Sequence, residues 1–72
     1  MYIIQEIQTE NNVTSLVNPV TEADRDEAES KFLLTCSYAV KSTVDIHTVI
    51  WYDEHGNIID RKFYEHLEQP AE

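Results

Sequence analysis

Short runs of alternating or mixed apolar positions make up most of this chain, and one longer segment between them follows a helical spacing. Four runs are rich in β-branched and aromatic side chains, which is typical of β-strands. They span residues 2–9, 13–20, 45–53 and 57–66. Asn11 and Asn12 favour a tight hairpin turn between the first two runs, because asparagine tolerates a positive φ. Pro19 lacks an N–H, so the second run ends there or lies at a sheet edge. Residues 53–56 have the preferences of a type I turn.

The segment at residues 22–41 is predicted to be an α-helix. Its apolar side chains recur at spacings of four, four and three residues, which places them on one face. This stripe consists of Ala28, Phe32, Cys36 and Ala39. Thr21 or Asp24 can cap the helix, and Glu27 lies three residues after Asp24, as in a capping box. Lys41 ends the segment, where a cation is favoured.

The order of these elements predicts an α+β fold. The chain runs ββαββ, so we expect a four-stranded, mainly antiparallel sheet with one helix packed on one face. Residues 1–66 are predicted to form a single domain, and residues 67–72 are predicted to be a flexible C-terminal tail. The order of the strands within the sheet does not follow from the pattern.

The predicted sheet is apolar on both faces, although one helix covers only one of them. In the third strand Ile46, Ile50 and Tyr52 lie on one face, and Val49 and Trp51 lie on the other. We therefore expect a homodimer or a higher symmetric oligomer. It would form through the sheet face opposite the helix or, as second choice, through the Leu34–Tyr38 side of the helix. The candidate interface residues are Leu34, Tyr38, Val49, Trp51 and Tyr64. Whether Trp51 or Tyr52 faces the partner stays open, because a one-residue slip exchanges the two faces.

The formal net charge is −9, and acidic residues are concentrated where the helix begins. This charge disfavours nucleic-acid binding, because phosphates would be repelled, and it makes basic proteins, or proteins that normally bind nucleic acid, the natural partners. The candidate partner surface consists of Glu22, Asp26, Glu27 and Glu29. The favoured alternative is that these acids are a solvated helix start, where negative charge stabilises the positive end of the helix dipole.

Residues able to perform catalysis or bind a metal are few and dispersed. His47, His55 and His66 lack the short paired spacing of a zinc site, and Cys36 is the only cysteine. The single glycine, Gly56, excludes a glycine-rich phosphate loop. We therefore expect no enzymatic activity, no metal and no cofactor. The lone cysteine and the lack of a signal peptide or a membrane-length apolar run predict a soluble cytoplasmic protein.

Three stretches resemble short uncharacterised proteins of bacteriophages and prophages, chiefly of Gram-positive hosts. They are YIIQEIQT at residues 2–9, DEAESKF at residues 26–32 and DEHGNIIDRKFYEH at residues 53–66. The resemblance covers residues 2–66 and implies a bacterial cytosol or a virion, and a small protein that works by binding. Our first hypothesis is an acidic, oligomeric, non-enzymatic binding protein that inhibits a host factor. The alternatives are a structural or assembly component of a virus particle and, less favoured, a small enzyme or metal-binding protein.

Overall fold

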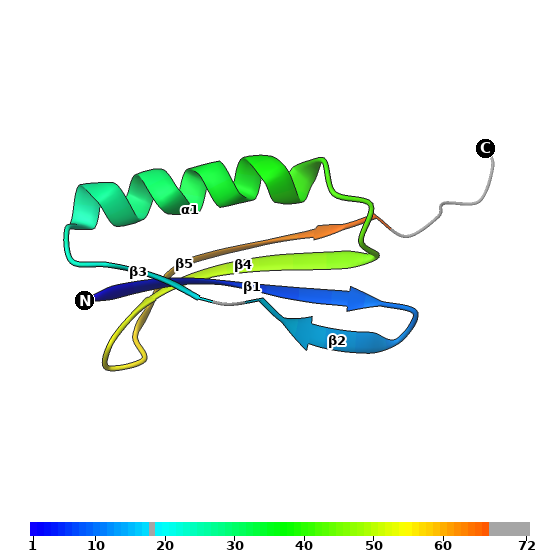
Figure 1. Cartoon of the computed structure of the whole chain (residues 1–72), viewed down its shortest axis with the longest axis horizontal. Coiled ribbons are helices and arrows are strands. Elements are labelled where there is room, and N and C mark those ends of the chain that lie inside the picture. The colour runs from blue at the N-terminus through cyan, green and yellow to red at the C-terminus, as the bar shows by residue number, and fades with distance from the viewer. Residues whose placement is uncertain (18, 67–72) are drawn as a thin grey trace.

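One α-helix lies across one face of a five-stranded antiparallel sheet (Figure 1). The elements are β1 (Tyr2–Glu10), β2 (Val13–Leu16), β3 (Val20–Glu22), α1 (Arg25–Val40), β4 (Ile46–Asp53) and β5 (Ile58–Glu65). This computed structural model describes residues 1–17 and 19–66, so the predicted tail at residues 67–72 lies outside the described residues. The α+β prediction is confirmed, with one strand more than expected.

The extra strand arises because the predicted second strand at residues 13–20 is divided. The sheet order is β2–β1–β4–β5, and β3 also pairs with β1. Leu16 at the end of β2 pairs with Ile7, and Val20 at the start of β3 pairs with Ile4. The chain thus uses one more residue than β1 between the two pairs, as in a β-bulge. Pro19 lies in this interruption, where the missing N–H breaks no ladder bond.

The two predicted hairpin turns have the expected backbone. Asn11 and Asn12 have φ values of 52° and 64°, as a tight turn with two residues at positive φ requires. In the second turn the Gly56 N–H donates to the Asp53 carbonyl at 3.0 Å, and the φ of Gly56 is 82°. The Asp53 carboxylate accepts hydrogen bonds from the N–H groups of His55 and Asn57, each at 2.9 Å. The β4–β5 hairpin is therefore closed by its own turn residues.

The helix begins three residues later than predicted. The carboxylate of Asp24 accepts a hydrogen bond from the Glu27 N–H at 3.0 Å, which confirms Asp24 as the N-cap. Thr21, the alternative cap, lies in β3 instead, because Val20–Glu22 pairs with the start of β1. The helix ends at Val40, and Lys41 is its C-cap.

The core lies between the helix and the sheet. The buried apolar residues are Ile4, Ala28, Phe32, Cys36, Ala39, Val49 and Trp51. The predicted helical stripe is thus confirmed as the buried face. The rings of Phe32 and Trp51 pack with centroids 5.8 Å apart, and the Arg25 guanidinium lies 5.2 Å from the Trp51 ring centroid. A cation over a tryptophan face is attracted by the ring quadrupole, which orients the first turn of α1.

Candidate functional site

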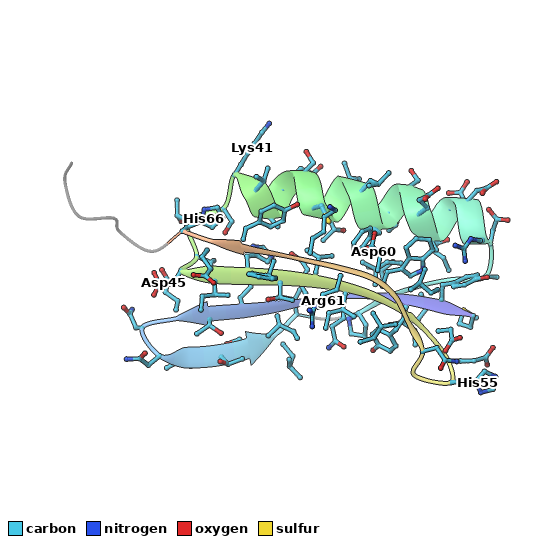
Figure 2. All side chains as sticks on the ribbon, turned by 180° about the vertical axis from the view of Figure 1, so that it is seen from behind. Lys41, Asp45, His55, Asp60, Arg61 and His66 are labelled. Carbon is cyan, nitrogen blue, oxygen red and sulfur yellow. The ribbon has the colours of Figure 1, made fainter. Side chains whose placement is uncertain are left out.

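The histidines do not come together in the structure. His47 is buried on β4, where its Nε2 donates to Glu6 Oε1 at 2.7 Å. His55 lies in the β4–β5 turn, and His66 lies near the C-terminal end of α1 with its Nε2 2.9 Å from the Ala39 carbonyl (Figure 2). No group of three or more potential metal ligands occurs within residues 1–17 and 19–66.

The Cys36 thiol is placed for packing. It is buried on the inner face of α1, and burial raises its pKa, although a hydrogen bond with Tyr64 lowers it in part. Burial raises the pKa of Tyr64 as well. A thiol with a raised pKa carries little thiolate at neutral pH and is a poor nucleophile. Cys36 therefore acts as a small apolar core residue.

A shallow groove lies at the end of the β1–β2 hairpin. Its volume is about 300 Å³, and it is lined by Gln8, Glu10, Asn11, Val13, Ser15 and Val44. Glu10 is its one ionisable lining residue. A general base or nucleophile needs a second group to activate or orient it, so this groove offers no arrangement for catalysis.

Two of the predicted interface residues are wrong. Val49 and Trp51 are 0% and 3% exposed and lie beneath α1, because the register of β4 turns His47, Val49 and Trp51 toward the helix. Tyr64 pairs with His47 and is half-buried against the same core, so it does not lie on the open side of the sheet either. The pattern correctly placed Tyr52 and Trp51 on opposite faces, but it did not determine which of these two faces α1 covers.

The other two predicted interface residues are at the surface. Leu34 and Tyr38 are 49% and 66% exposed on the outer side of α1. Leu33 and Val40, which flank the buried stripe, are also exposed. The second half of the helix therefore exposes four large apolar side chains, but they do not share one face: Leu34 and Tyr38 lie on the outer side, and Leu33 and Val40 lie beside the buried stripe.

The sheet face opposite α1 has no helix over it within the described part of the chain (Figure 1). We call it the uncovered face. The strand registers assign to it Ile3, Gln5, Ile7, Thr9, Thr14, Leu16, Thr21, Ile46, Thr48, Ile50, Tyr52, Ile58, Arg61, Phe63 and Glu65. Leu16, Ile58 and Phe63 are 67%, 61% and 57% exposed. Tyr52 donates its hydroxyl hydrogen to Gln5 Oε1 at 3.0 Å, so part of its polar surface is already satisfied within the chain.

A bulge in β5 decides which isoleucine joins this face. The β4–β5 register shifts between Trp51 and Tyr52, so that Trp51 pairs with Asp60 and Tyr52 pairs with Ile58. Ile59, the extra residue, packs against the core instead. Strict alternation would have placed Ile58 with Tyr64 and Ile59 with Phe63, and the bulge reverses this assignment. No local sequence signal marks the bulge.

The uncovered face is electrically balanced, unlike the rest of the molecule. Arg61 and Glu65 are its charged residues, and both lie on β5. Figure 2 shows Arg61 on the side of β5 away from α1, with Asp60 on the helix side. Two opposite charges give this face a formal net charge of zero, whereas the whole chain carries −9.

The predicted acidic surface lies at one end of the molecule. Asp26, Glu27 and Glu29 are exposed in the first turns of α1, and Glu22 is half-buried at the end of β3. Tyr2 pairs with Glu22 on one side and with Asp53 on the other, so the β4–β5 turn lies at the same end. We call this region the acidic end. It consists of Glu22, Asp24, Asp26, Glu27, Glu29, Asp53 and Glu54.

Some carboxylates of the acidic end have structural partners. Asp24 caps the helix, Asp53 closes the turn, and Glu54 accepts from the N-terminal amine of Met1 at 3.0 Å. The sequence analysis did not assign Asp53 and Glu54 to this region. Their proximity to the helix start depends on β1 lying between β3 and β4, and strand order did not follow from the sequence.

Comparisons with protein-family models, with curated proteins and with solved structures found no match. Among the described residues, no helix combines the length and the apolar character needed to cross a membrane.

Proposed function

We propose that this chain is a small, non-enzymatic protein-binding protein that uses the uncovered face as a docking surface. The observation that carries the proposal is the apolar character of this face on all of the longer strands, with half-buried Ile3, Ile7 and Ile50 and exposed Phe63. Incomplete burial of an aliphatic or aromatic side chain forfeits part of the roughly 1.5–3 kcal/mol that full burial contributes. A small domain has a net stability of about 5–15 kcal/mol, so covering several such side chains matters.

The acidic end supplies the second half of the proposal. Asp26, Glu27 and Glu29 have no salt-bridge partner among the described residues, so their charge is directed to solvent. A negative surface of this kind steers association with a basic protein and suppresses acidic partners. In the bacterial context that the phage resemblance implies, the target is a basic host factor, which the chain inhibits by occupying its basic surface. The chain would then act in the host cytosol.

Affinity capture tests this proposal. The immobilised chain is incubated with bacterial lysate, and the bound proteins are identified by mass spectrometry. Two variants are compared with the natural chain. One replaces Phe63 by Glu, and the other replaces Glu22, Asp26, Glu27 and Glu29 together by Gln.

We expect selective capture of one basic host protein, which the glutamine variant loses while its circular dichroism spectrum stays unchanged. Capture of tail or capsid proteins would favour the alternative of a structural component of a virus particle. A capture profile that neither variant changes would contradict the use of both surfaces.

A further inference from the structure

We propose that the uncovered face binds a second copy of this chain, packed face to face about a two-fold axis that runs across the strands at Phe63. This inference rests on the proposed function, because it names the occupant of the same docking surface. Four steps support it: the charge of the face, the position of its charged pair, its area, and the poorer fit of the exposed apolar side chains of α1.

The charge distribution favours a second copy as the occupant. Two chains of charge −9 repel each other through most of their surfaces, and like charges brought together in an interface are strongly unfavourable. The uncovered face is the exception, because Arg61 and Glu65 balance and its remaining side chains are apolar or neutral. It is therefore the surface through which this acidic chain can meet itself without placing acids against acids.

The positions of Arg61 and Glu65 select the axis. They lie two residues on either side of Phe63 on one strand, about 13 Å apart, which is too far for a salt bridge within the chain. A two-fold axis across the strands at Phe63 stacks β5 on the second copy's β5 in the opposite direction. Arg61 of each copy then faces Glu65 of the other, so the dimer contains two such pairs and each charge has a partner. An axis along the strands would instead place β5 over β2, whose residues Val13–Leu16 carry no charge.

The same axis aligns the apolar centre of the face. The registers place Phe63 beside Thr48, Thr48 beside Ile7, and Ile7 beside Leu16, so these four residues form one row across the sheet. In the proposed dimer this row lies on the axis and each residue meets its counterpart. Two twisted sheets that pack in this way are held about 10 Å apart, with side chains interdigitating between them.

The area of the face reaches the smallest size expected of a specific dimer interface. Four strands at about 4.8 Å spacing and eight residues at about 3.4 Å rise give a face of about 500 Å². Two copies together would bury about 1,000 Å², which is the lower bound for a specific interface. The exposed apolar residues of α1, namely Leu33, Leu34, Tyr38 and Val40, do not share one helical face and lie on the element that begins with the exposed acids.

The first experiment measures mass in solution. Light scattering after gel filtration, over a range from about 1 to 100 µM, which populates any dimer with a dissociation constant in or below the micromolar range, should show a species of twice the 8.4 kDa chain mass. Phe63→Glu should convert it to a monomer, because a charge replaces the apolar side chain on the axis. Tyr38→Glu, an equally exposed aromatic position on α1, is the matched control and should leave the dimer intact.

A charge exchange tests the axis itself. Arg61→Glu alone places Glu against Glu, and Glu65→Arg alone places Arg against Arg, so each should weaken dimerisation by at least about tenfold. The double variant R61E/E65R restores both pairs and should regain the dimer. Mixing the two single variants should give a heterodimer, because all contacts between an R61E chain and an E65R chain are then complementary.

Several outcomes would overturn the inference. One is a monomer at every concentration, and another is a dimer that resists Phe63→Glu but is lost with Tyr38→Glu. The absence of heterodimers from the mixed single variants would reject the axis. The proposed function is judged separately: if the chain is monomeric but Phe63→Glu abolishes capture of a host protein, the proposed docking surface stands and the second copy is wrong.

Discussion

The two phenylalanines offer a sharp test of how the fold divides into a covered and an uncovered side. Phe32 is 1% exposed and packs against Trp51 beneath the helix, whereas Phe63 is 57% exposed on the uncovered face. Each is to be replaced by alanine, so that the chemical change is the same and only the environment differs. Urea and thermal unfolding are then followed by circular dichroism at low and high protein concentration.

Phe32→Ala should be severe. Truncation of a buried phenylalanine costs roughly 3–5 kcal/mol through lost transfer free energy and the cavity left behind. A domain of this size loses roughly 4–8 °C of Tm per kcal/mol, so we expect a fall of roughly 12–40 °C or complete loss of the fold. This cost should not depend on protein concentration, because the side chain is buried within one chain.

Phe63→Ala should behave differently. Because a little over half of Phe63 is exposed, truncation removes less than half of a full burial contribution, or about 1 kcal/mol in the isolated chain. If a second copy covers the face, the loss grows with protein concentration, because association stabilises the natural chain by mass action. An equal, concentration-independent loss for Phe63→Ala and Phe32→Ala would show that the chain covers Phe63 itself, and would refute the two-sided description of the sheet.

Three further predictions concern single side chains. Asp24→Ala removes the acceptor of the Glu27 N–H and should lower the free energy of unfolding by about 1 kcal/mol in urea titrations, whereas Asp24→Asn, which keeps a capping oxygen, should cost less. The backbone N–H of Asn57 holds the pKa of Asp53 below its ordinary value of 3.8, so the turn's contribution is present above that pH and is lost as the pH falls through the lowered folded value. The urea midpoint should therefore fall in acid, and Asp53→Asn should reduce the part of this fall that occurs below about pH 4. Alkylation of Cys36 at pH 8 should be slow in the native protein and rapid in urea, and rapid native alkylation would contradict its burial.

The sequence predicted those parts of the fold that depend on local chemistry. The stripe from Ala28 to Ala39 marks the buried face of the helix because its spacing matches the helical repeat. Asn11 and Asn12 mark a turn because their side chains tolerate positive φ. The missed features depend on pairing between distant segments. The division at Pro19 follows from how two short strands share β1, and the burial of Trp51 follows from which face α1 covers.

The candidate surfaces likewise include residues that local spacing predicts and residues whose position depends on pairing between distant segments. Leu34 and Tyr38 are recognised from helical spacing alone, because they lie away from the buried stripe. Val49 and Trp51 were assigned to the open side because alternation separates two faces without saying which one is covered. The Glu6–His47 hydrogen bond is also beyond local reasoning, because it joins residues 41 positions apart through the β1–β4 register. The placement of Ile58 on the uncovered face and of Ile59 against the core could not be predicted either, because it depends on the bulge in β5.

The position of the acidic end gives independent support for an axis across the strands. This region lies where β1 begins and β4 ends, at one end of the long axis of the sheet (Figure 1). A two-fold axis along the strands would place both acidic ends side by side, whereas an axis across them places the acidic ends at opposite extremes of the dimer. Strands of eight residues span about 27 Å, several times the screening length of about 8 Å at physiological salt, so the two acidic ends would hardly repel each other. The pairing of Arg61 with Glu65 and the separation of the acidic ends therefore select the same arrangement, although they involve different residues. Such a dimer carries two outward-facing acidic ends, which allows it to hold two copies of a basic partner, or two sites of one partner, at the same time.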